Sequence, residues 1–177
     1  MRALGPGSVS SFLKIILDVI YVGLWIFVSL LSLFTLVALL FSFNPELLSE
    51  ILPISDAVEA VSKDGPLFAG ALAAWALLLG GWMFIVERLR RIFATLTAGD
   101  PFHPDNVRRL RVVGLILAGL EVGRYIFSGM ARWLAPKTKV IDDSFTLTAW
   151  FSVLVVFVLA EVFREGARLR REAELTI

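Results

Sequence analysis

Residues 19–43 read VIYVGLWIFVSLLSLFTLVALLFSF, an unbroken run of 25 residues without a charged side chain. A helix needs about 20 apolar residues to cross the hydrocarbon core of a bilayer, so this run is long enough to span one. A secretory signal peptide is the competing interpretation, because Lys14 precedes the run. Signal peptides carry an apolar region of only about 7–15 residues, followed by a small-residue cleavage pattern that is missing here. The run is therefore predicted to be a retained transmembrane helix.

Two further apolar runs, residues 66–86 and 145–163, have the same character. The first carries no charge and starts at Pro66, which suits the first turn of a helix. The second is interrupted only by Glu161, near its end. Both are predicted to cross the membrane.

The remaining run, residues 112–135, contains charged residues, namely Glu121, Arg124 and Arg132. A charge near the bilayer centre costs about 2.5–3.5 kcal/mol, whereas each strongly apolar residue contributes only about 0.3–0.6 kcal/mol to insertion. We therefore expect this helix to insert only with neighbouring helices that shield its charges from lipid.

The composition agrees with a membrane protein. Hydrophobic residues make up 58% of the 177 residues, charged residues only 19%, and the mean hydropathy is +0.81. Soluble domains are about half apolar and a quarter charged. The sequence predicts an all-α integral membrane four-helix bundle in one domain, residues 1–177, with spans at about residues 15–43, 66–88, 108–135 and 145–165.

Positive residues indicate which way the spans run, because they concentrate on the cytoplasmic side of a membrane. Residues 87–111 hold six arginines, and the C-terminal tail holds four, Arg164, Arg168, Arg170 and Arg171. Residues 44–65 instead have one lysine against five acids. Four spans with both termini in the cytoplasm satisfy this distribution.

The connections carry helical patterns of their own. An apolar stripe in residues 47–61 is typical of one or two short amphipathic helices at the outer interface. On the inner side, the second helix is predicted to continue to Gly99, a natural C-cap, and Asp105 or Asn106 to cap the third. The result is a cytoplasmic helical hairpin.

Glu121 and Arg124 form a candidate intramembrane charge site. They lie three residues apart on one helix face, near the predicted bilayer midplane, and can pair with each other. Ionisable residues at this depth often serve proton, ion or substrate paths, so a small transporter or proton-coupled channel is one hypothesis. The alternative is that the pair neutralises itself and fixes the helix in the bundle. Asp18 and Glu161 are expected to pair with Arg88, Arg111 or Arg164.

Enzymatic chemistry has little support in the sequence. The chain has no cysteine, which excludes disulfides and thiolate metal sites, and its single histidine leaves few other options for a metal. No phosphate-binding glycine loop or metalloprotease motif occurs. No catalytic residues, metal or cofactor are predicted, and His103 is expected to be a solvated loop histidine. The arginines of the inner loop could bind anionic lipid or nucleic acid, but the positive-inside rule explains them without a ligand. Membrane lipid is the expected surrounding, and no direct nucleic-acid partner is expected. Small-residue faces leave a homo-oligomer open.

Two stretches resemble a known family: GDPFHPDNVRRL at residues 99–110, and LAEVFREGARL at 159–169 followed by EAELTI at 172–177. With the four predicted spans they are similar to the YoaS-like family of bacterial membrane proteins, a domain of unknown function. The resemblance implies no catalytic residues. It implies a possible cytoplasmic partner, because members are often encoded beside a small helix-turn-helix regulator.

The matching positions that face the cytoplasm form a candidate interaction motif, consisting of Asp100, Pro101, Phe102, Asn106, Glu161, Arg164 and Gly166. We expect the turn and the tail to form one patch. Gly166 is expected to interrupt the helical run of the tail, which ends in the apolar triplet at residues 175–177. A solvated helix end and a docking peptide both remain open for this tail.

Overall fold

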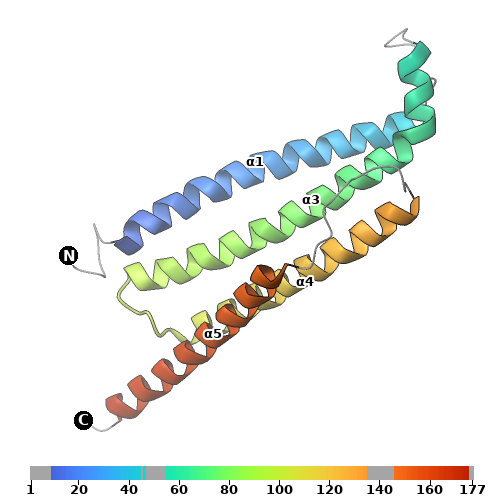
Figure 1. The fold of residues 1–177 in the computed structure, drawn as a ribbon. Coiled ribbons are helices and arrows are strands. Elements are labelled where there is room, and N and C mark those ends of the chain that lie inside the picture. Colours follow the sequence, from blue (N-terminus) through green and yellow to red (C-terminus); the bar gives the residue numbers. More distant parts are fainter. Residues whose placement is uncertain (1–8, 45, 47–54, 135–145, 176–177) are drawn as a thin grey trace. The chain divides into compact units, whose positions relative to one another are not determined.

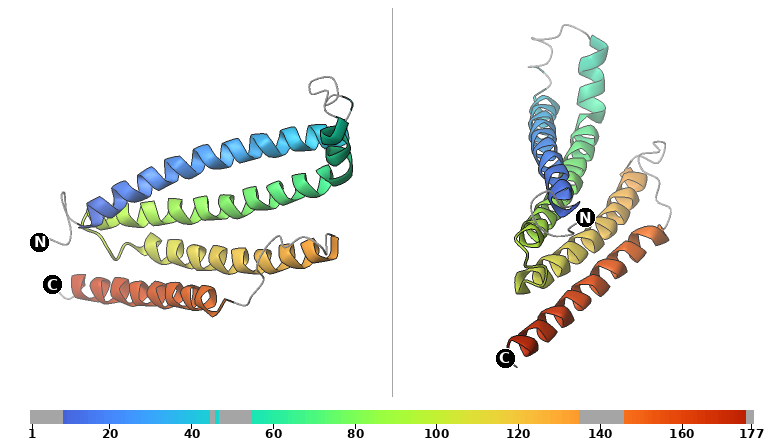
Figure 2. Two further views of the ribbon diagram at one scale, coloured as in Figure 1. Left: turned by 45° about the horizontal axis from the view of Figure 1, so that its top comes forward. Right: turned by 90° about the vertical axis from the view of Figure 1, so that its left-hand side faces the viewer.

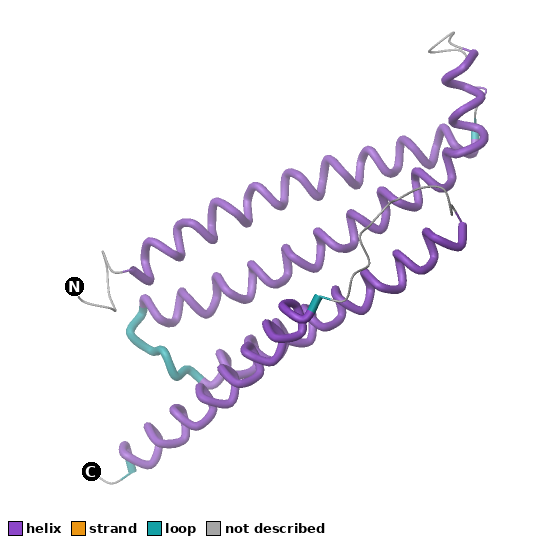
Figure 3. The backbone as a smooth tube through the Cα atoms, viewed as in Figure 1, coloured by secondary structure: helices purple, strands orange, loops and turns teal. Residues whose placement is uncertain are grey.

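The computed structural model describes residues 9–44, 46, 55–134 and 146–175. Within these residues the regular structure is all helical, without a strand (Figures 1 and 3). The helices are α1 (Val9–Phe43), α3 (Ser55–Thr97), α4 (Pro104–Leu134) and α5 (Leu147–Glu174). The prediction of an all-α chain is confirmed for the described part.

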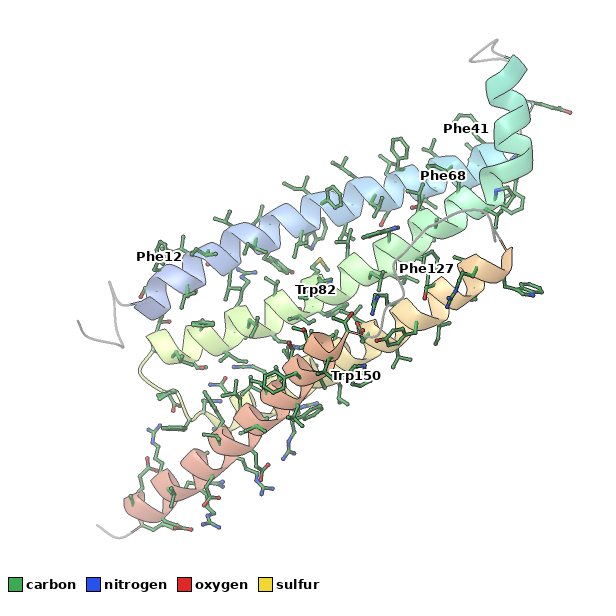
Figure 4. All side chains as sticks on the ribbon, in the orientation of Figure 1. Phe12, Phe41, Phe68, Trp82, Phe127 and Trp150 are labelled. Atoms are coloured by element: carbon green, nitrogen blue, oxygen red, sulfur yellow. The ribbon has the colours of Figure 1, made fainter. Side chains whose placement is uncertain are left out.

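Three of these helices are long and apolar enough to cross a membrane. The segments are Ser11–Phe43 in α1, Gly65–Thr97 in α3 and Leu147–Glu174, which is the whole of α5. Their large apolar side chains are mostly exposed, as for Phe12 on α1 and Phe68 on α3 (Figure 4). Such exposure is expected where a helix faces lipid. The 31 residues of α4 are long enough to cross, but α4 is not one of these three helices, and Glu121, Arg124 and Arg132 interrupt its apolar part.

The chain divides into two compact units, and each is described by itself. In residues 22–80, α1 and α3 approach closely at Gly65, where an added Cβ would lie 3.2 Å from the Oγ of Ser42.

The expected helix start at Pro66 is wrong, because α3 begins at Ser55 and Pro66 lies inside it. Proline removes one backbone hydrogen bond and bends a helix, and the first turns of α3 are inclined to the rest (Figure 1).

Residues 55–65, assigned from sequence to the outer loop, therefore belong to α3. The outer amphipathic segment at residues 47–54 and the third connection at residues 135–145 lie outside the described residues.

In the other unit, residues 1–21 and 81–177, α4 and α5 lie side by side and antiparallel (Figure 2). The buried residues of α5 are spaced by seven, at Val153, Ala160 and Ala167, so one narrow stripe faces inward. An added Cβ at Gly114 would lie 3.0 Å from the ring of Phe157, so the two helices meet closely there.

The end of α3 joins the same core. Its Ile92 packs with Leu110 of α4 and Ala160 of α5 in one buried cluster, which Leu89, Leu96 and Phe163 surround. Further along α3, an added Cβ at Gly81 would lie 2.5 Å from the Cδ2 of Leu120 on α4. Three helices therefore meet around the turn that connects α3 to α4.

That turn starts where α3 ends at Thr97. Gly99 has a φ of +84°, its N–H donates to the carbonyl of Leu96, and the N–H of Asp100 donates to the carbonyl of Thr95. This is the Schellman pattern, which requires a residue in the left-handed region, so the predicted C-cap at Gly99 is confirmed.

The predicted cap of the next helix is wrong. The first residue of α4 is Pro104, and the N–H of Asp105 donates to the Nδ1 of His103 at 3.2 Å. His103 therefore caps α4, whereas Asp105 and Asn106 already lie inside its first turn, since proline favours the first helical position.

Candidate functional site

The turn between α3 and α4 is attached to the C-terminal part of α5 by an ion pair. The Nη1 of Arg170 donates to the Oδ1 of Asp100 at 2.5 Å, and the Nε of Arg170 donates to Glu174 at 3.0 Å. Both side chains of the Asp100–Arg170 pair are well exposed, so the pair contributes little to stability. Its role is to fix the position of the turn on the helix.

An aromatic contact lies beside this ion pair. The ring of Phe102 packs on Gly166, where an added Cβ would lie 2.6 Å from the Cδ1 of Phe102. The same ring lies 5.8 Å from the ring of Phe163, at a tilt of 58°. The expected interruption at Gly166 is wrong, because α5 continues through it to Glu174. This glycine makes room for the ring of Phe102.

Asn106 holds the turn from within. It is 0% exposed, and its Nδ2 donates to the Oγ1 of Thr95 at 2.7 Å and to the carbonyl of Pro101 at 3.1 Å. Its Oδ1 accepts from the Nη1 of Arg109 at 3.0 Å, and the same Nη1 donates to the carbonyl of Arg91 at 3.3 Å. One amide thus connects the end of α3, the turn and α4.

Glu161 and Arg164 form a second cluster further along α5. Glu161 pairs with Arg164 on its own helix, and its Oε2 lies 3.7 Å from the Nη2 of Arg111 on α4. The expected pairing of Glu161 with Arg111 and Arg164 is therefore observed. The partner of Asp18 is Arg90 instead of the expected residues, and Tyr21 lies under the same guanidinium group.

The structure thus brings together part of the predicted motif. The turn contains Asp100, Pro101 and Phe102. Asn106, at the start of α4, donates a hydrogen bond to it, and Gly166 lies beneath it. We call this assembly, with Arg170 added, the turn surface. Sequence reasoning missed Thr95, Arg109 and Arg170, which fix it. Among the described residues no group of three or more acidic or histidine side chains is suited to a metal ion.

The other candidate site lies within α4. The Nη2 of Arg124 donates to the Oε1 of Glu121 at 2.7 Å, and its Nε donates to the Oε2 at 3.3 Å, so the pair is bidentate. Glu121 is only 9% exposed. Arg124 also donates to the Oγ1 of Thr146, the residue before α5, at 3.3 Å. The pair therefore ties α4 to the start of α5.

We predict that Asn106→Ala lowers the free energy of unfolding by about 1–3 kcal/mol, because it leaves buried polar partners unsatisfied. Asp105→Ala, one residue away and exposed, should cost less than about 1 kcal/mol. Thermal or denaturant unfolding of the protein in detergent measures both. Equal losses for the two variants would contradict the role given to Asn106.

We also predict that Glu121→Gln destabilises the protein by about 3–5 kcal/mol, because Arg124 then keeps a buried charge without its partner. The double variant Glu121→Leu, Arg124→Leu should recover most of that loss, since it removes both charges together. The same unfolding measurement gives the coupling between the two residues. Losses that simply add in the double variant would show that the pair does not act as a unit.

Comparison with protein-family models places the chain in a family. A family model described as a protein of unknown function (DUF2975) matches residues 50–177, which include α3, α4, the turn surface and α5. Comparison with curated proteins and with solved structures gives no match. Because the family model covers most of the sequence, the chain belongs to the DUF2975 family of proteins of unknown function.

Proposed function

We propose that the chain is a non-enzymatic inner-membrane protein that binds a cytoplasmic protein through the turn surface. The observation that carries this proposal is the fixation of the turn on α5. An ion pair, an aromatic contact and a buried amide hold the same few residues in place. A surface ordered before binding loses little conformational entropy when a partner docks.

The way in which α3, α4 and α5 connect supports four spans. The turn that ends α3 contacts the C-terminal part of α5, so those two ends share one side of the membrane if both helices cross. The start of α5 then lies on the opposite side, and α4 has to carry the chain back across. At about 1.5 Å per residue its 31 residues are long enough.

The side that holds the turn surface is the cytoplasmic one in this proposal. The segments that form and flank it, residues 87–111 and the C-terminal part of α5, contain six and four arginines. The positive-inside rule then places both termini in the cytoplasm.

The proposed partner is a small DNA-binding regulator of the helix-turn-helix type, which the family resemblance suggests. The exposed part of α5 supports protein docking, because it alternates arginine and glutamate and then presents Leu175 at 88% exposure. Binding there would hold the regulator at the membrane and away from DNA.

A transporter or proton-coupled channel at Glu121 and Arg124 is the second candidate, and the contacts favour it less. Glu121 accepts two hydrogen bonds from Arg124 within one helix, and Arg124 also donates to Thr146. A carboxylate held in a bidentate pair is poorly suited to repeated proton transfer. We therefore assign the pair to the assembly of α4 with α5.

We predict that reversing one charge of the turn surface weakens binding of the proposed helix-turn-helix regulator. Asp100→Arg or Arg170→Asp alone places like charges together and should raise the Kd about tenfold, a loss of about 1.4 kcal/mol. The double variant Asp100→Arg, Arg170→Asp restores the ion pair and should restore binding. Titration of the purified regulator against the protein in lipid nanodiscs measures all four affinities.

The result that would contradict the proposal is a regulator that fails to bind the wild-type protein, or that binds all four forms equally. Unfolding temperatures serve as the control, because a partly exposed pair has little effect on stability.

A further inference from the structure

Arg88 differs from the other arginines near the inner ends of α3 and α4. Its Nε is buried, and none of the described residues accepts a hydrogen bond from it. The neighbouring carboxylates are engaged elsewhere, since Asp18 pairs with Arg90, Glu87 with Arg91 and Glu161 with Arg111. The chain therefore holds one guanidinium group that is half-buried and unpaired within the described structure.

The position of Arg88 explains its burial. Ile85 and Ile92 lie three residues before and four residues after it, on the same face of α3, and are 4% and 5% exposed. Ile92 packs in the cluster with Leu110 and Ala160. Gly81, further along α3, lies close to the side chain of Leu120 on α4. Arg88 thus lies in the apolar stripe through which α3 packs against α4.

An arginine in this place requires an acceptor. A guanidinium group is a charged donor in every protein environment, whereas a buried lysine or carboxylate can become neutral. A buried charged donor without an acceptor is costly, and an anionic oxygen removes most of that cost. The planar guanidinium group matches the two oxygens of a phosphate particularly well.

The depth of Arg88 indicates where such a phosphate comes from. The predicted span of α3 ends at residue 88, and Trp82 lies six residues earlier with half of its surface exposed (Figure 4). Tyr21 lies under Arg90 at 4.4 Å, which adds a second aromatic ring at this level. Tryptophan and tyrosine mark the headgroup region of a bilayer, where phospholipid phosphates lie.

We propose that Arg88 binds a phosphoryl oxygen of an anionic phospholipid headgroup in the inner leaflet. The six arginines of residues 87–111, against three acids, supply the positive field that attracts such a lipid. The lipid lies at the end of the α3 and α4 packing stripe and supplies the acceptor that the described part of the protein does not. This inference rests on the membrane orientation proposed above but is independent of the regulator.

The test uses the full chain purified in an uncharged maltoside detergent. Phosphatidylglycerol, diacylglycerol with the same acyl chains and inorganic phosphate are added separately, and lipid affinity and unfolding temperature are measured. Arg88→Gln is compared with Arg108→Gln, because Arg108 is an exposed arginine of the same arginine-rich segment, residues 87–111. Phosphatidylglycerol should stabilise the wild type, whereas diacylglycerol should not.

Arg88→Gln should weaken phosphatidylglycerol binding about tenfold, and Arg108→Gln should change it less than about twofold. In detergent without lipid, Arg88→Gln should unfold at a higher temperature than the wild type, because it removes a buried charge without an acceptor. That second readout also shows that the variant is folded.

Equal binding of phosphatidylglycerol by the wild type and Arg88→Gln would overturn the site. An equal effect of inorganic phosphate would overturn its assignment to a lipid. Loss of regulator binding in Arg88→Gln is not expected, because Arg88 is not part of the turn surface. The lipid site and the docking proposal can therefore fail separately.

Discussion

The ion pair between Glu121 and Arg124 constrains the remainder of the chain, because a helix that carries it is poorly suited to face lipid alone. α4 contributes the pair, Thr146 just before α5 is a further acceptor, and small residues such as Gly114 let the two helices approach. α3 also contacts α4, through Gly81 and Ile92. The helix that carries the pair is thus in contact with both α3 and α5.

The same helix begins at the turn surface, so its packing and the proposed function are connected. Asn106 lies in the first turn of α4 and fixes the turn to α3, while Phe102 and Asp100 fix it to α5. A partner bound to this turn would contact three helix ends at once. Movement of α5 against α4 would alter the turn surface directly, since Gly166 and Arg170 lie on the part of α5 that contacts it.

Much of the fold could be predicted because its signals are local. Apolar runs of sufficient length identify α1, α3 and α5, and Gly99 identifies the end of α3.

The errors in the predictions arise where residues distant in the sequence determine the local structure. Pro66 was expected at a helix start, but α3 tolerates it as a bend, and Gly166 was expected to interrupt α5, although a ring from the turn fills the space beside it. Spacing could pair Glu121 with Arg124 on one helix, but it could not reveal that Asn106 would bond to Thr95, or that Arg88 would be left without an acceptor.

The topology of the chain depends on whether α4 crosses the membrane. Because the chain contains no cysteine, single introduced cysteines can measure this directly. Single cysteines at Ala98, Lys139 and Glu172 would be labelled with a membrane-impermeant maleimide in intact spheroplasts and again after permeabilisation. The account predicts that Lys139→Cys reacts in intact spheroplasts, whereas Ala98→Cys and Glu172→Cys react only after permeabilisation. Labelling of Glu172→Cys from outside, with Ala98→Cys protected, would show that α4 does not cross and would contradict the account.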